Sequence, residues 1–225
     1  MIPEMDSTSK DPPVSLWNLK VYGIVQGVGF RPFVSRLAAS HEILGSVANR
    51  GSYVEIFAQG KEEDLAAFRE GILLHPPKRA VVQKLETTVL EAPGQTNLPD
   101  GPETPPVFDD FRIIESVREE GEILISPDIA ICENCKRELM DPADRRYLHP
   151  FINCTDCGPR LTILDAMPYD RERTSMGEFP MCEDCEWEYT HPESRRYDAQ
   201  PVCCNACGPE VFLLDREERG TAAIT

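Results

Sequence analysis

The residues with the clearest chemical pattern are eight cysteines, arranged as four Cys-x-x-Cys pairs. The pairs are Cys132/Cys135, Cys154/Cys157, Cys182/Cys185 and Cys204/Cys207. Eighteen residues separate the two pairs of each half, and the halves superpose at an offset of 50 residues. A repeat of this quality indicates two copies of one small unit, and two such pairs in one unit are typical of a four-thiolate zinc site.

A metal site closed by four sulfur ligands has no open coordination position, so we expect two structural Zn²⁺ ions rather than catalytic ones. Binding within each repeat is the preferred pairing. The alternative is an interleaved pairing, in which the outermost pairs share one ion and the inner pairs share the other. Disulfides are a second alternative, but residues 1–13 contain no apolar run typical of a signal peptide. A reducing, cytoplasmic location is therefore expected.

Two other features of the cysteine region are ambiguous from sequence. Cys203 aligns with Asn153 of the first repeat, so we expect a spare thiol rather than a ligand. The Arg-Arg-Tyr elements at 145–147 and 195–197 are compatible with several roles. They either line a passage for an anion, contact other domains, or pin a loop over the metal unit through ion pairs, which is the commonest role of such residues.

A glycine-containing loop upstream forms the second chemical pattern. It consists of Gln26, Gly27, Val28, Gly29, Phe30 and Arg31. Glycines allow consecutive N–H groups to converge, a following helix adds the positive end of its dipole, and the guanidinium of Arg31 can hold two phosphate oxygens. The loop lacks the lysine of a Walker motif and the spacing of a dinucleotide fingerprint, so a small phosphate dianion is the expected ligand. The alternative is a plain glycine turn, with Arg31 in a surface ion pair.

The residues around this loop predict its supporting elements. Alternating apolar residues predict strands at 17–25, 44–48, 53–58 and 81–89, while helical spacing predicts helices after Pro32 and over 65–72. Residues 111–114 are expected to add an edge strand. The order β-α-β-β-α-β is the ferredoxin-like, α+β arrangement, and two small zinc-finger units with four cysteines each follow it.

Charge and hydropathy exclude two classes of partner. The chain has 23 Lys and Arg against 39 Asp and Glu, a net charge of −16, which opposes binding to the phosphates of nucleic acid. It contains no run of eighteen apolar residues that would span a membrane. We therefore expect neither a nucleic-acid nor a membrane partner.

The segment Gly23–Arg31 resembles the signature of acylphosphatases, and Gly45–Asn49 resembles the second motif of that family. The resemblance implies hydrolysis of a carboxyl–phosphate anhydride without a metal or a covalent intermediate. Arg31 would hold the phosphate together with the loop amides, and Asn49 would orient the attacking water. Gly51 departs from the family pattern, because it follows Asn49 by two residues rather than four. The alternative role of Asn49 is a turn residue that caps its own backbone.

An acylphosphatase-like domain followed by duplicated cysteine units is similar to the N-terminal part of HypF-type carbamoyltransferases, which mature nickel–iron hydrogenases. Phe151–Arg160 and Ala166–Arg171 strengthen the match. The resemblance implies carbamoyl phosphate or another acyl phosphate as substrate. Later domains would adenylate the carbamate with ATP and transfer the carbamoyl group to a HypE-type acceptor, for synthesis of cyanide ligands. Since the sequence stops at Thr225, we expect a fragment without those domains. The alternative is a zinc-scaffolded docking module without independent activity.

Composition shifts divide the chain into seven predicted parts. Polar, proline-containing residues mark the leader, and an acidic run at 119–122 marks a connector. The parts are a disordered leader at 1–15, the acylphosphatase-like domain at 16–118, a connector at 119–131, zinc-finger unit 1 at 132–165, a linker at 166–181, zinc-finger unit 2 at 182–215 and a truncated tail at 216–225.

Overall fold

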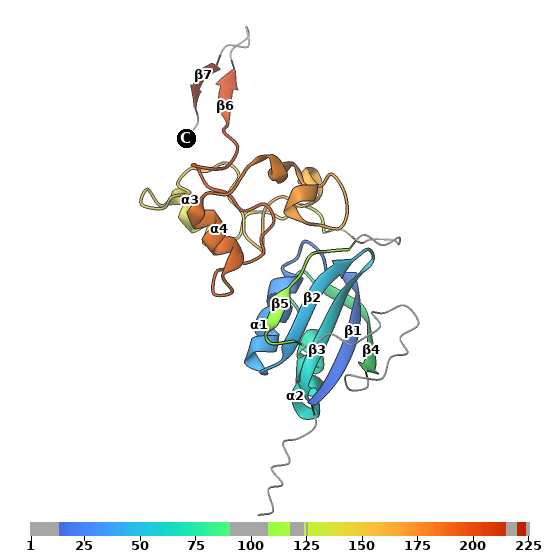
Figure 1. The fold of residues 1–225 in the computed structure, drawn as a ribbon. Helices are drawn as coiled ribbons and strands as arrows, with labels where there is room; N and C mark the ends of the chain where they lie inside the picture. The colour runs from blue at the N-terminus through green and yellow to red at the C-terminus, as the bar shows by residue number, and fades with distance from the viewer. Residues whose placement is uncertain (1–13, 91–107, 118–123, 125, 215–219, 224–225) are drawn as a thin grey trace, which may run out of the picture.

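A computed structural model describes residues 14–90, 108–117, 124, 126–214 and 220–223. An α+β domain is formed by the first two ranges, and a region of short helices and loops, here called the cysteine region (residues 126–214), packs against one end of it (Figure 1). No helix in the described ranges is both long enough and apolar enough to cross a lipid bilayer.

The first domain is built on a five-stranded mixed sheet with the strand order β4-β1-β3-β2-β5. Its strands are β1 Val14–Ile24, β2 Leu44–Arg50, β3 Tyr53–Lys61, β4 Val81–Leu90 and β5 Phe111–Ile113. β1 pairs antiparallel with β3 and β4, β2 pairs antiparallel with β3, and β5 lies parallel to β2 at one edge. The predicted β-α-β-β-α-β order and the additional edge strand are confirmed.

Two helices, α1 Phe30–Ser40 and α2 Glu62–Leu74, cover one face of this sheet (Figure 1). Alternate residues of β1, such as Leu19 and Val21, are fully buried beneath them. Val34 of α1 and Phe68 of α2 belong to the same apolar cluster. The cluster contains no residue of the cysteine region, so the first domain has a core of its own.

The two cysteine repeats adopt matching local structures. Helix α3 Glu133–Met140 starts immediately after Cys132, and α4 Glu183–Thr190 starts immediately after Cys182. Three short 3₁₀ turns lie between these helices: η1 Leu161–Ile163, η2 Arg171–Arg173 and η3 Ser175–Glu178. The cysteines and a few neighbouring apolar residues make up the buried cluster of each repeat.

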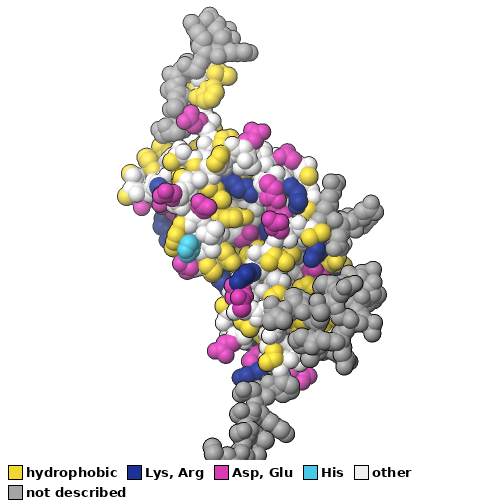
Figure 2. Space-filling model, viewed as in Figure 1, with side chains coloured by type: hydrophobic (Ala, Val, Ile, Leu, Met, Phe, Trp, Pro, Cys, Tyr) yellow, Lys and Arg dark blue, Asp and Glu magenta, His cyan; other side chains and the backbone are white. Residues whose placement is uncertain are grey.

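A two-stranded antiparallel hairpin, β6 Phe212–Leu214 and β7 Gly220–Ala223, projects from the cysteine region (Figure 1). The three residues of β6 are large, apolar and exposed. Figure 2 shows hydrophobic side chains toward the upper end of the molecule, where this hairpin lies.

Some segment boundaries differ from those predicted. β1 begins at Val14, so the last two residues assigned to the leader belong to a strand, where Val14 pairs with Lys61. The end of the predicted connector is part of the first repeat, because Ile129 is buried and forms a β-bridge with Gly158. Residues 1–13, the proline-rich stretch at 92–107 and the acidic run at 119–122 lie outside the described residues.

Candidate active site and metal clusters

The loop between β1 and α1 has the backbone that an anion cradle requires. Gly27 and Gly29 have φ values of 68° and 72°, in the left-handed region that favours glycine. Gly29 is the N-cap of α1, and the first N–H groups of a helix have no intrahelical acceptor. Of the six predicted loop residues, all except Val28 line one small cavity; Val28 is buried in the core instead. The loop therefore presents backbone amides and a helix N-terminus to this cavity.

Asn49 reaches the same cavity from β2. Its side chain is 2% exposed, and no hydrogen-bond partner for its Oδ1 atom is present among the described residues. Arg50 pairs with Tyr53, so Gly51 lies in a tight two-residue turn. Nε2 of Gln26 donates to the Gly51 carbonyl at 3.0 Å, which ties that turn to the glycine loop. The changed glycine spacing thus still leaves Asn49 beside the loop.

Arg31 also lines the cavity and is held by two carboxylates of the cysteine region. Its Nη1 atom donates to Asp170 Oδ1 at 2.6 Å and to Ser116 Oγ at 3.1 Å, and its Nε atom lies 3.0 Å from Asp198 Oδ2. The residue is 7% exposed, so the ion pairs are buried, unlike the surface pair considered as the alternative. Burial opposes the charge of Arg31, but Asp198 and Asp170 outweigh it and raise the pKa of the guanidinium.

Burial also raises the pKa of Asp198, against the opposing effect of Arg31, and the neighbouring charge of Asp170 raises it further. Two carboxylates thus share the guanidinium of Arg31, and Asp170 also pairs with Arg173, whose Nη1 atom lies 3.2 Å from Asp170 Oδ2. When both carboxyls are ionised, their two negative charges already offset the charges of these two arginines before any ligand binds. A phosphate dianion that binds Arg31 must therefore compete with the carboxylates of Asp170 and Asp198.

The opposite wall of the cavity comes from the cysteine region. It is lined by Thr155, Arg160, Tyr169, Asp198, Ala199, Gln200 and Pro201. The guanidinium of Arg160, which is buried, directs all five of its N–H groups to backbone carbonyls. One of these carbonyls belongs to Gly27, and the other four belong to residues 154–159 of the first repeat. Arg160 therefore fastens the first repeat to the glycine loop.

Tyr169 and Asp170 belong to the predicted linker between the repeats, and Asp198 belongs to the second repeat. Sequence reasoning did not assign these three residues to the site. Asp170 and Asp198 lie 139 and 167 positions from Arg31 in sequence, and no local pattern indicates such a contact. The available signal was the segment Ala166–Arg171, which contains Tyr169 and Asp170 and matches a motif between the two cysteine units.

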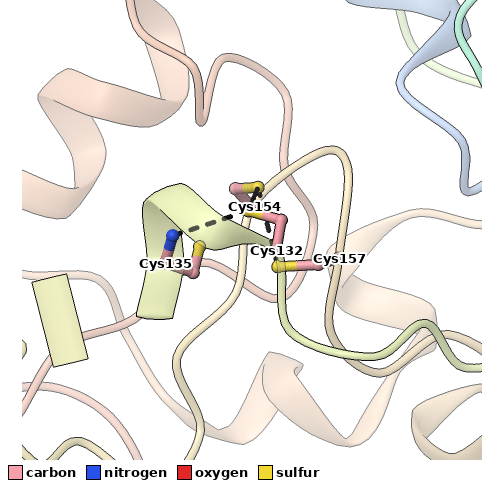
Figure 3. A group of neighbouring side chains, drawn as sticks. All are labelled: Cys132, Cys135, Cys154 and Cys157. Atoms are coloured by element: carbon pink, nitrogen blue, oxygen red, sulfur yellow. Dashed lines mark hydrogen bonds between the residues drawn. The ribbon is translucent and has the colours of Figure 1, made fainter. Parts of the chain in front are cut away.

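Both groups of four cysteines are assembled within a single repeat. One consists of Cys132, Cys135, Cys154 and Cys157, shown in Figure 3, and the other of Cys182, Cys185, Cys204 and Cys207. The four Sγ atoms of each group lie within 4.8 Å of one another, which excludes the interleaved pairing. All nine cysteines are free rather than disulfide-bonded.

The cysteine clusters fit a tetrahedral ion. Sγ atoms lie 3.8 Å apart in the pairs Cys132/Cys154 and Cys154/Cys157, and 3.7 Å apart in the pair Cys182/Cys204. Four sulfurs at a Zn–S distance of about 2.3 Å in a tetrahedron are separated by roughly 3.8 Å. The donor set and its spacing therefore suit Zn²⁺.

The Arg-Arg pairs of the two repeats cross over. Nη1 of Arg195 donates to Cys135 Sγ at 3.3 Å and Nη2 to Glu138 at 2.5 Å. In the same way, Nη1 of Arg145 donates to Cys185 Sγ at 3.3 Å and Nη2 to Glu188 at 2.5 Å. The ion pairs expected of the Arg-Arg-Tyr elements are present. However, the two arginines of each element contact the metal cluster of the other repeat, not that of their own.

The second arginine of each pair is buried and also donates a hydrogen bond to the other repeat. Arg146 Nε donates to the carbonyl of Cys203 at 2.8 Å, and Arg196 Nε donates to the carbonyl of Asn153 at 2.9 Å. Cys203 itself is buried, lies outside both four-cysteine groups and has its Sγ atom 3.2 Å from Nε2 of His149. The repeats thus form one interlocked body rather than two independent units.

Comparison with known sequence families matches both parts of the chain. Residues 17–98 match the acylphosphatase family, and residues 131–164 and 181–214 each match the HypF finger family. The two repeats are therefore HypF fingers, and the first domain is an acylphosphatase domain.

Curated relatives and a solved structure share both parts. A probable carbamoyltransferase HypF from Methanocaldococcus jannaschii is 46% identical over 156 residues, which are 68% of this chain and 19% of the relative. Carbamoyltransferase HypF2 from Cupriavidus necator is 41% identical over 178 residues, 78% of this chain and 21% of the relative. A crystal structure of a full-length HypF in phosphate- and nucleotide-bound form superposes with a TM-score of 0.82 at 41% identity, covering 92% of this chain and 26% of that one. The chain thus spans about a fifth of the length of the curated relatives it matches.

Proposed function

Because the chain belongs to the HypF carbamoyltransferase family over its acylphosphatase domain and its two fingers, we propose that the acylphosphatase domain hydrolyses carbamoyl phosphate. The observation that carries the proposal is the convergence of Arg31, the glycine loop and the unpartnered Oδ1 atom of Asn49 on one cavity. A relative with this fold binds phosphate, and the loop at residues 26–31 leads into the N-terminus of α1, where backbone amides favour an anion.

The mechanism follows from the charges and donors of the cavity. The loop N–H groups and Arg31 bind the phosphoryl oxygens, and the Asn49 amide orients a water molecule toward phosphorus. The water oxygen forms the new bond to phosphorus while the bond to the bridging oxygen breaks, and the electron pair of the broken bond leaves with the carbamate. One proton of the water passes to a phosphoryl oxygen, so the products are carbamate and dihydrogen phosphate. Positioning and charge stabilisation supply most of the rate enhancement in such transfers.

The carboxylates at Arg31 set a condition on substrate binding. Nε of Arg31 lies 3.0 Å from Oδ2 of Asp198. A phosphate that binds the Nε edge of Arg31 must therefore displace Asp198 or share the guanidinium with it. Asp170 approaches through Nη1 instead. We propose that Asp198 gives way to the substrate while Asp170 keeps the guanidinium in position.

The finger clusters would each hold one structural Zn²⁺ through four thiolates. A bound Zn²⁺ would supply folding free energy to segments that have little apolar core of their own. We further propose that carbamate formed here feeds an ATP-dependent adenylation and a transfer to a HypE-type acceptor in cytoplasmic hydrogenase maturation. These later steps require residues beyond the acylphosphatase domain and the fingers.

Phosphate release from carbamoyl phosphate tests the proposed hydrolysis. Arg31→Ala leaves the buried Asp198 without its arginine, so Arg31→Lys is the better variant: it keeps the charge but loses the planar two-point contact. We expect Arg31→Lys and Asn49→Ala each to lower kcat/KM by roughly 10²-fold. Asn49→Ala should leave the affinity for inorganic phosphate nearly unchanged, because it acts on the water.

The matched control is Arg69→Ala, on α2, where the side chain donates to Thr87 away from the cavity. Its turnover should equal that of the unaltered chain. Unchanged turnover in both Arg31→Lys and Asn49→Ala would refute the assignment.

The double clasp on Arg31 favours one second candidate, a zinc-scaffolded docking module without hydrolytic activity. In that case the ion pairs to Asp170 and Asp198 are permanent and hold the two domains together. This candidate predicts neither phosphate binding nor phosphate release in a zinc-loaded, folded chain.

A further inference from the structure

Tyr169, between the two fingers, has a buried hydroxyl group that forms no hydrogen bond within the described part of the chain. The residue is 4% exposed, and its hydroxyl makes no hydrogen bond to any described residue. Three buried side chains have such an atom in the described ranges: Asn49, Asn153 and Tyr169. Asn49 and Tyr169 line the same cavity, whereas Asn153 does not. Burying an unpaired polar group is unfavourable, so a ligand that pairs with both groups recovers that cost.

The position of Tyr169 is fixed from three sides. Its backbone N–H donates to Oε1 of Gln26 at 3.4 Å, and the next residue, Asp170, binds Arg31. Its ring lies 3.8 Å from the position that a Cβ atom on Gly27 would occupy. The ring therefore packs directly on the glycine loop, and its orientation is set by contacts that do not involve the hydroxyl.

We propose, on the basis of the hydrolysis proposed above, that Tyr169 is a catalytic residue whose hydroxyl donates a hydrogen bond to the acyl part of the substrate. The loop amides and Arg31 already provide the donors for the phosphoryl group. The acyl group consequently faces the remaining wall, which the finger region provides through Thr155, Arg160 and Tyr169.

The chemistry of the leaving group explains why a donor is useful there. When water attacks phosphorus and the bond to the bridging oxygen breaks, the electron pair of that bond passes to the carbamate oxygens. Tyr169 keeps its proton throughout and stabilises the developing negative charge by its hydrogen bond. Burial raises the pKa of Tyr169 to about 12, although the charge and the close approach of the Arg160 guanidinium, and then the charge of Arg31, oppose this shift. The hydroxyl is therefore protonated, and able to donate, at neutral pH.

The decisive variant is Tyr169→Phe, which removes only the hydroxyl. Because this group has no protein partner among the described residues, the unfolding midpoint should stay the same or rise. For carbamoyl phosphate, kcat should fall by roughly 10²-fold with a smaller change in KM, since the contact strengthens in the transition state. Tyr22→Phe is the matched control: Tyr22 donates to Glu86 on the sheet and lies outside the cavity lining, so turnover should be unchanged.

Binding of unreactive ligands separates this inference from the proposed hydrolysis. Phosphonoacetamide keeps the carbamoyl group and replaces the bridging oxygen with CH₂, whereas inorganic phosphate has no acyl group. Tyr169→Phe should weaken binding of phosphonoacetamide about tenfold and leave phosphate binding unchanged. Arg31→Lys should weaken the binding of both ligands. Titration calorimetry on the zinc-loaded chain measures all four values.

Three other outcomes would count against the inference. Equal behaviour of Tyr169→Phe and the unaltered chain, toward both ligands and in turnover, would overturn the role of Tyr169 and leave the hydrolysis standing. An equal loss of affinity for phosphate and phosphonoacetamide would overturn the assignment to the acyl group. Absence of phosphate binding and turnover in the unaltered chain would overturn the hydrolysis and this inference with it.

Discussion

Asp198 contacts Arg31 in the way that a bound phosphate would. Its two carboxylate oxygens lie 3.0 Å from Nε and 3.4 Å from Nη2 of Arg31, the two-point geometry that a phosphate would adopt on the same edge. Gln200 donates to Asp198 Oδ1 at 2.8 Å and holds the carboxylate in this position. An intramolecular carboxylate of this kind competes with any dianion that enters the loop.

The competition predicts a pH-dependent effect of Asp198→Asn. Sulfate is a suitable probe because it stays a dianion from pH 4 to pH 8. Above the raised pKa of Asp198 the carboxylate repels sulfate, so the neutral amide should bind it roughly three- to tenfold more tightly. Below that pKa the carboxyl of the unaltered chain is itself neutral, and the difference should vanish. Titration calorimetry between pH 4 and pH 8 measures it.

Asp64→Asn provides the control, because Asp64 lies in the first turn of α2, far from the cavity lining. It should leave sulfate affinity unchanged at every pH. A constant ratio of affinities between Asp198→Asn and the unaltered chain across the pH range would contradict the competition.

The two metal clusters depend on each other through elements that lie 50 residues apart. Glu138 of α3 accepts hydrogen bonds from Arg195 and Arg196, and Glu188 of α4 accepts them from Arg145 and Arg146. Partial burial raises the pKa of Glu138, but the two arginines outweigh it and lower the pKa to about 2. Its stabilising contribution is therefore complete above the ordinary carboxyl pKa and is lost only as the pH falls toward 2.

Glu138→Gln and Glu188→Gln form a matched pair of variants in equivalent positions. Each removes the carboxylate nearest to a buried arginine: Arg146 loses Glu188, and Arg196 loses Glu138 and keeps only a 3.4 Å contact with Glu188. Each variant should therefore lower the free energy of unfolding at neutral pH by about 1–3 kcal/mol. Urea unfolding of the zinc-loaded chain measures this effect. The rate of zinc transfer to a chromogenic chelator should rise for both clusters in either variant, because the affected arginines donate to a sulfur of one cluster and belong to the repeat that carries the other cluster.

Glu133→Gln, at the exposed start of α3, is the control for charge alone. If zinc release accelerated at only one cluster in each of the two glutamate variants, the fingers would be independent of each other. Faster release at both clusters agrees with the interlocked arrangement.

The whole molecule consists of two parts with separate cores and one shared cavity. The apolar cluster of the first domain contains no finger residue, whereas the cavity lining draws on both parts. The core that stabilises the first domain thus lies within that domain alone, whereas the geometry of the site depends on both parts. The first domain can remain folded under conditions that dismantle its site.

Removal of zinc tests this separation. We expect two Zn²⁺ per chain by elemental analysis, one for each cluster. After treatment with a strong chelator, amide hydrogens of α3 and α4 should exchange quickly, because the fingers lose most of their folding free energy. Amides of β1, β3 and α2 should stay protected. Rapid exchange throughout the chain, measured by mass spectrometry, would show that the first domain depends on the fingers.

The parts of this structure that were predictable from sequence are the local ones. Alternation and helical spacing predicted the β-α-β-β-α-β order, and the Cys-x-x-Cys spacing predicted both clusters, because these signals repeat over short distances. The contacts of Arg31 with Asp170 and Asp198, and the crossing of the arginines, were not predictable. They join residues 37 or more positions apart whose types also suit ordinary surface ion pairs.

The exchanged arginines also bear on how such a repeat can be inherited. A single copy, cut out alone, would leave Glu138 without the cations that offset it and would turn Arg145 and Arg146 toward empty solvent. Because each repeat supplies arginines that pair with a glutamate of the other, deletion of either repeat removes these ion pairs from the repeat that remains. The smallest portable module is therefore the tandem, and grafting these fingers onto another protein requires both copies.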